Sequence, residues 1–131
     1  MKEKFPYFYK LICINKLYFK GDNLRIKNYN DLEEINNLIY ILYQSIKDLD
    51  DINSLIEVVL NVTGKILYMQ PFYDGNSRTL KDFIKSIFKS LKYDIEINEN
   101  DYIIPILFEE EQCTEEELNF FKKKVFLKKE V

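Results

Sequence analysis

The chain has 131 residues, of which 47% are apolar and 31% charged, and its formal net charge is −3. This length and apolar fraction are typical of one domain with a core of its own, and they argue against a disordered chain. The slightly acidic balance argues against a nucleic-acid partner. With two cysteines and no histidine the chain cannot supply the usual zinc ligands, and we expect neither zinc nor haem.

Targeting signals are not evident in the sequence. Every apolar run is shorter than the roughly 18 residues of a membrane span. The N-terminus lacks both an uninterrupted apolar stretch and a small-residue cleavage site, so a signal peptide is not predicted. Cys13 and Cys113 lie far apart and are interpreted as ordinary buried or half-buried thiols. We therefore expect a cytoplasmic protein without membrane contact.

The first third of the chain gives mixed signals. Residues Tyr7 to Tyr18 form a dense apolar run that is compatible with a helix or a strand. The turn signal Gly21-Asp22-Asn23 precedes an alternation of apolar and basic residues, which predicts a short strand or hairpin over Gly21–Tyr29.

Three long segments then follow a helical period. The first is expected from about Asp31 to Lys47, the second from about Asp51 to Met69 and the third from near Asn76 to Lys92. The second is apolar on two faces, which predicts a central, buried helix. The third carries one apolar stripe, formed by Leu80, Phe83, Ile84, Ile87, Phe88 and Leu91.

The C-terminal third predicts two more helices. A short one is expected from about Asp101 to Glu110, with Pro105 in or near its first turn. Another begins after Thr114, because Glu117 stands three residues on and completes a capping box. The predicted fold is therefore mainly α: a single helical domain over residues 1–131, with a small β-hairpin near its start.

The junction between the second and third long helices has the chemistry of an anion site. The stretch MQPFYDGNSRTLKDF, Met69 to Phe83, places Gly75 and Arg78 at the start of a helix. The first N–H groups of a helix have no partner within it, and the helix dipole puts partial positive charge there. Arg78 can form two parallel hydrogen bonds to a phosphate, and Asp74 can hold Mg²⁺ against phosphate oxygens. The alternative is an ordinary turn between helices with solvated charges.

The stretch QPFYDGNSRTLK, Gln70 to Lys81, also resembles the signature of the Fic domain family, His-x-Phe-x-(Asp/Glu)-Gly-Asn-x-Arg-x-x-Arg. The Phe, Asp, Gly, Asn and Arg stand at the family's spacing. The upstream hairpin, the buried helix before the loop and the helix after it are similar to the family as well. The resemblance implies a Fic-like helical bundle whose hairpin forms a flap. It also implies a protein adenylyltransferase, which moves AMP from ATP to a protein hydroxyl and in toxin–antitoxin pairs acts as the toxin.

The resemblance assigns a role to each matching residue: Mg²⁺ binding to Asp74, binding of ATP phosphates to Gly75, Asn76, Ser77 and Arg78, and anchoring of the loop in the core to Phe72. Lys81 stands where the family has a second Arg. It keeps the positive charge but cannot make a planar bidentate contact. A target or an inhibitor protein would dock at the Gly21–Tyr29 hairpin.

The departure with the largest consequence is Gln70, which stands in the position of the family's catalytic His. A carboxamide can hold a hydroxyl in place but cannot act as a general base. The inhibitory pattern Ser/Thr-x-x-x-Glu-(Gly/Asn) found in many members does not occur in the sequence. The chain therefore depends on a separate inhibitor or has no activity to inhibit.

Three functional interpretations stay open at this point. The first is a pseudoenzyme: a Fic-like protein that keeps a nucleotide-binding loop and has lost, or nearly lost, AMP transfer. The second is an active transferase in which Gln70 positions the target and another group takes the proton. The third is a non-catalytic interaction module that pairs its hairpin with a partner strand. Gln and His codons differ by one base, so both natural drift and deliberate replacement account for Gln70.

Overall fold

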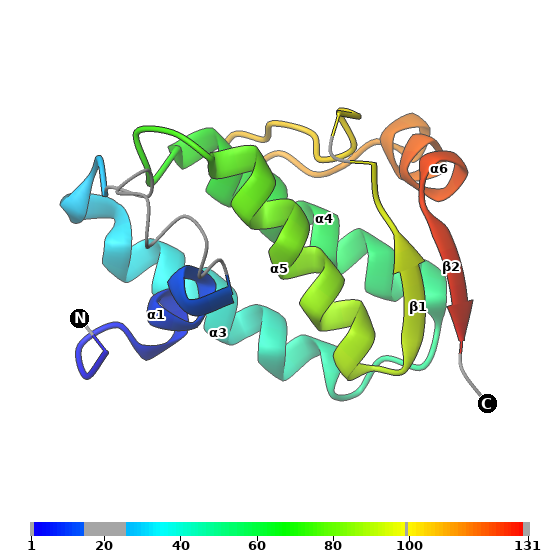
Figure 1. The fold of residues 1–131 in the computed structure, drawn as a ribbon, viewed down its shortest axis with the longest axis horizontal. Helices are drawn as coiled ribbons and strands as arrows, with labels where there is room; N and C mark the ends of the chain where they lie inside the picture. Colours follow the sequence, from blue (N-terminus) through cyan, green and yellow to red (C-terminus); the bar gives the residue numbers. More distant parts are fainter. Residues whose placement is uncertain (1, 15–25, 99, 130–131) are drawn as a thin grey trace.

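The structure, a computed structural model, describes residues 2–14, 26–98 and 100–129, without the side chain of Phe126. It is mainly helical with a small antiparallel sheet, which confirms the predicted fold class (Figure 1). The elements in chain order are α1 (Pro6–Ile14), the 3₁₀ turn η1 (Tyr29–Asp31), α3 (Leu32–Ile46), α4 (Ile52–Met69), α5 (Asn76–Ser90), β1 (Tyr93–Glu96), α6 (Glu115–Lys124) and β2 (Phe126–Lys129).

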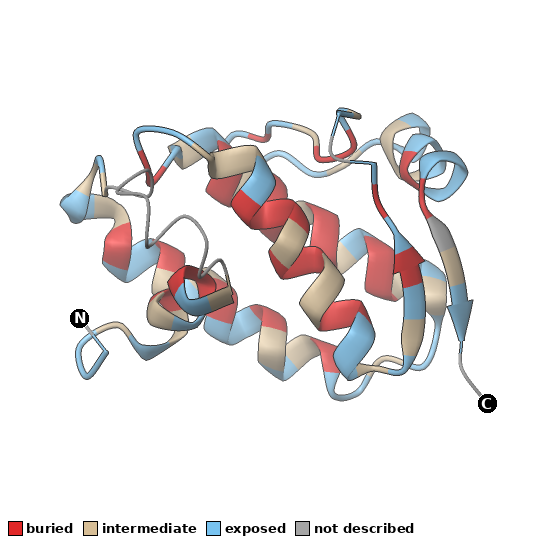
Figure 2. Cartoon of the chain, in the orientation of Figure 1, coloured by how far each residue is buried: buried red, intermediate tan, exposed pale blue. Residues whose placement is uncertain are grey.

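The two helices on either side of the signature, α4 and α5, pack against each other, as the sequence predicts. The side chain of Asp51 caps α4 by accepting the backbone N–H groups of Asn53 and Ser54. By length and composition alone α4 could cross a membrane, but half of it is buried inside this fold, as in the central helix of a globular core. Figure 2 shows that much of both helices is buried.

The apolar stripe of α5 lies in the core. Leu80, Phe83, Ile84, Ile87 and Phe88 are all buried, and they pack against a cluster to which α1, α3 and α4 also contribute. α3 contacts both α4 and α1, and α1 also contacts α5. α5 therefore starts at the surface with its first turn and continues as a core helix, which holds its N-terminus in a fixed position.

The ambiguous N-terminal run is helical where the structure describes it, as α1. Pro6 suits the first position of a helix, since the N–H it lacks would have no partner there. The next two N–H groups, of Tyr7 and Phe8, are donated to the side-chain oxygen of Asn36 on α3, at 2.8 and 3.0 Å. A side chain 28 residues away thus caps α1. Residues 15–18 lie outside the described part of the chain.

The small sheet is formed by segments that the sequence did not mark as strands. β1 pairs with β2 in an antiparallel register, with Tyr93 opposite Lys129 and Glu96 opposite Phe126. The chain turns into β1 at Lys92, whose φ of 69° ends the preceding helix. The predicted end of that helix at Lys92 is accordingly two residues too long, because α5 ends at Ser90. The predicted hairpin over Gly21–Tyr29 is a different segment, and its residues 21–25 lie outside the described part of the chain. Of its described residues, Ile26 forms an isolated bridge and Tyr29 begins η1.

The predicted helix from Asp101 to Glu110 is wrong. Residues 102–108 have no regular secondary structure, bend at Ile104 and cross α4 at Gly64. The backbone N–H of Leu107 donates to the carbonyl of Gly64 at 3.1 Å, and the space in front of Gly64 is filled by Pro105 and Leu107. Pro105 removes one helical donor, and this contact with a distant glycine favours the irregular path. The last helix, α6, begins with the predicted capping box of Thr114 and Glu117.

Candidate functional site

The loop between α4 and α5 begins at Gln70, which ends α4 in the left-handed conformation with φ of 46°. Its backbone N–H donates to the carbonyls of Ile66 and Leu67, both at 3.2 Å. A non-glycine residue in this region costs about 1–3 kcal/mol and persists only where its surroundings hold it. The following residue, Pro71, cannot continue a helix. Gln70 thus lies at a sharp corner with its side chain exposed to solvent.

Phe72 anchors the loop in the core. Its side chain is 1% exposed and stacks on the ring of Phe8 in α1, with ring centroids 5.8 Å apart. This is the position that the resemblance implied for it. The side chain of Asn36 on α3 caps α1. Through its contact with Phe8, Phe72 therefore connects the loop to α1 and, through α1, to α3.

Asn76 closes the loop with its side chain. Its Oδ1 accepts the N–H of Phe72 at 2.9 Å, and its Nδ2 donates to the carbonyl of Phe72 at 2.8 Å. Both ends of the carboxamide are therefore committed to the loop backbone. Asn76 can therefore contact a ligand through its backbone N–H, which lies in the first turn of α5. From the sequence alone, a contact through its side chain was equally compatible.

Gly75 is the N-cap of α5 and adopts φ of 79°, which a residue with a side chain rarely takes. As a glycine, this N-cap residue has no side chain that could accept an N–H of the first turn. The carboxylate of Asp74 accepts the N–H of Gly75 at 2.9 Å and is otherwise exposed. The loop therefore places an acidic side chain beside a helix start that its own N-cap residue does not cap.

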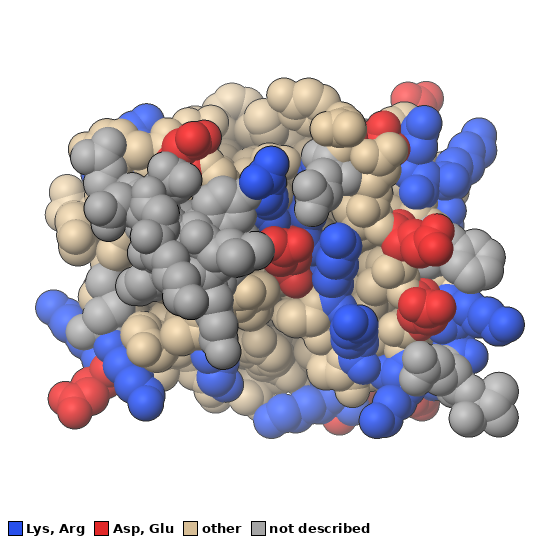
Figure 3. All heavy atoms as spheres, viewed as in Figure 1, with Lys and Arg blue, Asp and Glu red and all other residues tan. Residues whose placement is uncertain are grey.

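Two basic residues follow in the first turns of α5, in different environments. Arg78 is exposed, whereas Lys81 is only 5% exposed and is the one buried charge among the described residues. Ser77, between Gly75 and Arg78, is partly buried. Figure 3 shows Lys and Arg side chains along α5 on the face in view. The alternative interpretation of this stretch, an ordinary turn with solvated charges, is therefore wrong for the side chain of Lys81.

A segment that sequence reasoning did not connect with the loop lies beside it. Ile26 forms an antiparallel bridge with Phe72, and the N–H of Lys27 donates to the carbonyl of Pro71 at 2.7 Å. Ile26 and Lys27 belong to the last part of Gly21–Tyr29, the region in which the sequence predicts a hairpin. The alternation around Ile26 predicted extended structure, but only the tertiary contact shows what it pairs with.

The sequence-predicted residues Gln70, Phe72, Asp74, Gly75, Asn76, Ser77 and Arg78 thus occupy one loop and one helix start, and Lys81 lies a turn further along α5. Comparison of the chain with family models, with curated proteins and with solved structures gives no match in any of the three.

Proposed function

We propose that this protein is a Fic-like pseudoenzyme that binds the phosphates of a nucleotide at the loop 70–78 and transfers AMP poorly or not at all. The observation that carries the proposal is the N-terminus of α5 at Gly75, a cap residue without a side chain, with the exposed residues Asp74 and Arg78 close to it in the chain. The resemblance to the Fic signature implies that the ligand is a nucleotide, and the local geometry is compatible with binding of its phosphates.

The phosphates would be held mainly by backbone. The N–H groups of Asn76 and Ser77 lie in the first turn of α5, where an α-helix leaves its donors without partners and its dipole attracts negative charge. Gly75 has no side chain to keep a phosphate away from these donors. Arg78 adds a guanidinium, and Asp74 adds a carboxylate that suits Mg²⁺ bridging to phosphate oxygens. ATP and Mg²⁺ are accordingly the proposed ligands.

Transfer is where the site falls short. In the family's reaction a His takes the proton from the attacking hydroxyl of the target protein. Gln70 has that place here, and a carboxamide takes up no proton near neutral pH. A general base contributes roughly 10²–10⁴-fold to a rate, so its loss leaves binding intact while removing most of the activity. Nucleotide binding with little or no AMP transfer is therefore what distinguishes the proposed pseudoenzyme from an active transferase.

Isothermal titration calorimetry of the full chain with ATP and Mg²⁺ tests the binding. We expect measurable binding in the parent and at least about tenfold weaker binding in Arg78→Ala, since a charge-assisted contact is lost. Lys89→Ala is the matched control, because Lys89 is exposed on the last turn of the same helix. Absence of binding at about millimolar ATP, or equal affinity in Arg78→Ala and the parent, would overturn the proposal.

A further inference from the structure

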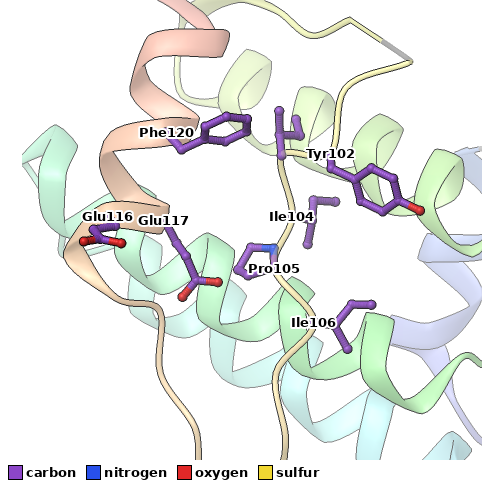
Figure 4. Close-up of a pocket in the computed structure, with 8 residues that line it drawn as sticks. Tyr102, Ile104, Pro105, Ile106, Glu116, Glu117 and Phe120 are labelled. Atoms are coloured by element: carbon purple, nitrogen blue, oxygen red, sulfur yellow. The ribbon is translucent and has the colours of Figure 1, made fainter.

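A groove on another part of the surface lies between the irregular segment 102–106 and α6. It has a volume of about 410 Å³ and is lined by Tyr102, Ile103, Ile104, Pro105, Ile106, Glu116, Glu117 and Phe120. Figure 4 shows Phe120 and Tyr102 on either side of the segment that carries Ile104 and Ile106. This volume is within the range of small binding pockets, and the groove shares no residue with the loop 70–78.

Large apolar side chains of this region are left in solvent. Tyr102 is 81% exposed and Ile106 55% exposed, and the neighbouring Phe108 and Phe120 are also exposed. Single exposed apolar residues are ordinary, but several around one concave surface are typical of a protein-binding site. The ring of Phe120 already has a cation near it, since the ammonium of Lys124 lies 5.8 Å from its centroid.

The rim of the groove is acidic, and this decides which partner fits. Glu116 and Glu117 line it directly, and Figure 4 shows Glu117 pointing toward Pro105. Glu116 is exposed, whereas one carboxylate oxygen of Glu117 accepts the backbone N–H of Thr114. Such a rim repels nucleic acid and anionic membrane surfaces, and it attracts Lys and Arg. The complementary occupant carries apolar side chains for the floor and basic ones for the rim.

The backbone of the groove can also contact a partner. The N–H groups of Ile104 and Ile106 have no acceptor among the residues that the structure describes. The segment is held from behind by the bond from Leu107 to Gly64, so its position does not depend on a partner. A bound peptide can therefore accept main-chain hydrogen bonds from groups that are already in place.

We propose that this groove binds a short protein segment that carries two or three apolar residues flanked by Lys or Arg. Ile106, Phe120 and Tyr102 contact the apolar residues of the partner, and Glu116 and Glu117 face its basic ones. The site is separate from the proposed nucleotide loop, and its occupation does not depend on nucleotide.

The test starts from phage-displayed random peptides of about twelve residues, selected on the full chain. The selected peptides are then synthesised with a fluorescent label and their affinity is measured by anisotropy. We expect enrichment of apolar residues flanked by Lys or Arg. We also expect Ile106→Ser to weaken binding at least about tenfold. Ile41→Ser is the matched control, because Ile41 is 54% exposed, lies on α3 and does not line the groove.

The charge of the rim is tested separately with Glu116→Gln, because Glu116 lines the groove and is exposed. This variant should weaken binding of the selected peptide several-fold and reduce the salt dependence of its binding, whereas Glu33→Gln, on α3, should do neither. ATP binding should be the same in all these variants, so failure here is distinguishable from failure of the nucleotide site. Enrichment of acidic peptides, no enrichment, or full affinity in Ile106→Ser overturns the proposal. So does the finding that Ile106→Ser removes only self-association or binding to phosphatidylserine vesicles.

Discussion

The side chain of Asn76 and the backbone of Phe72 form a closed pair of hydrogen bonds, one in each direction, at 2.9 and 2.8 Å. This pair connects the start of α5 to the buried anchor of the loop. It fixes the distance between the exposed corner at Gln70 and the helix N-terminus without any ligand. The loop is therefore preorganised, which reduces the ordering cost of binding.

Replacing Asn76 tests this preorganisation. Asn76→Ala leaves an N–H and a carbonyl of Phe72 without their partners, and we expect the free energy of unfolding to fall by about 1–3 kcal/mol. Asn76→Asp keeps the acceptor and loses the donor, so its loss should be smaller. Urea denaturation followed by circular dichroism measures both. Asn37→Ala, at an exposed position of α3, is the control and should change stability little. A loss no greater than in Asn37→Ala would show that the pair does not stabilise the fold.

Restoring a general base tests the proposed loss of chemistry. Gln70→His places an imidazole at the exposed corner of the loop, and we expect protein labelling from labelled ATP and Mg²⁺ to rise by about 10²-fold or more. The variant Gln70→His/Asp74→Ala should lose the signal if the carboxylate holds Mg²⁺. Labelling of the parent at an appreciable rate would instead identify a working transferase with different proton chemistry. A silent Gln70→His that still binds ATP would place the defect at Lys81, Ser77 or an absent target contact.

The crossing of segment 102–108 over α4 depends on Gly64. A Cβ at this position would lie 2.7 Å from the carbonyl oxygen of Pro105 and 2.9 Å from Leu107 Cδ1. Ala is the better helix former by about 1 kcal/mol, but the clash is with backbone and costs about 1–3 kcal/mol or more, so we expect Gly64→Ala to destabilise the protein. Thermal and urea unfolding would measure the change. Gln44→Ala, at an exposed position of α3, controls for helix propensity and should be neutral or slightly stabilising. An increase in stability for Gly64→Ala would contradict the close approach.

The two thiols should differ in reactivity. Burial, together with the negative charges of Glu117 and Glu57, raises the pKa of Cys113 to about 12. Since the thiolate is the reacting form, very little of Cys113 is reactive near pH 8, and its labelling should accelerate as the pH rises. Cys13 is exposed and should react first with iodoacetamide. Mass spectrometry over a pH series measures the labelling rate of each cysteine. Glu57→Gln removes one of the nearby negative charges and should speed the labelling of Cys113. Equal rates at the two sites would show that Cys113 is not shielded.

Much of the helical architecture could be predicted from local pattern. Leu32, Ile35, Ile39 and Leu42 recur at the helical period and are buried in α3. The cap at Asp51 and the capping box of Thr114 with Glu117 are formed as their short-range spacing indicates. Each of these features is decided by residues within about four positions of one another, which is the range of helical hydrogen bonds. The candidate site was predictable for the same reason, because its residues are consecutive.

What the tertiary structure decided involves partners far apart in the chain. Residues 102–108 carry apolar residues suited to a helix, but a bond from Leu107 to Gly64 and the lack of a side chain at Gly64 favour an irregular path without a helix. The pairing of β1 with β2 and the bridge from Ile26 to Phe72 are long-range as well. Lys81 has the sequence context of a surface charge, and only packing shows that it is buried. The sequence by itself therefore determined the helices and the composition of the loop. The surface against which each segment packs depends on contacts between distant residues, which local periodicity does not record.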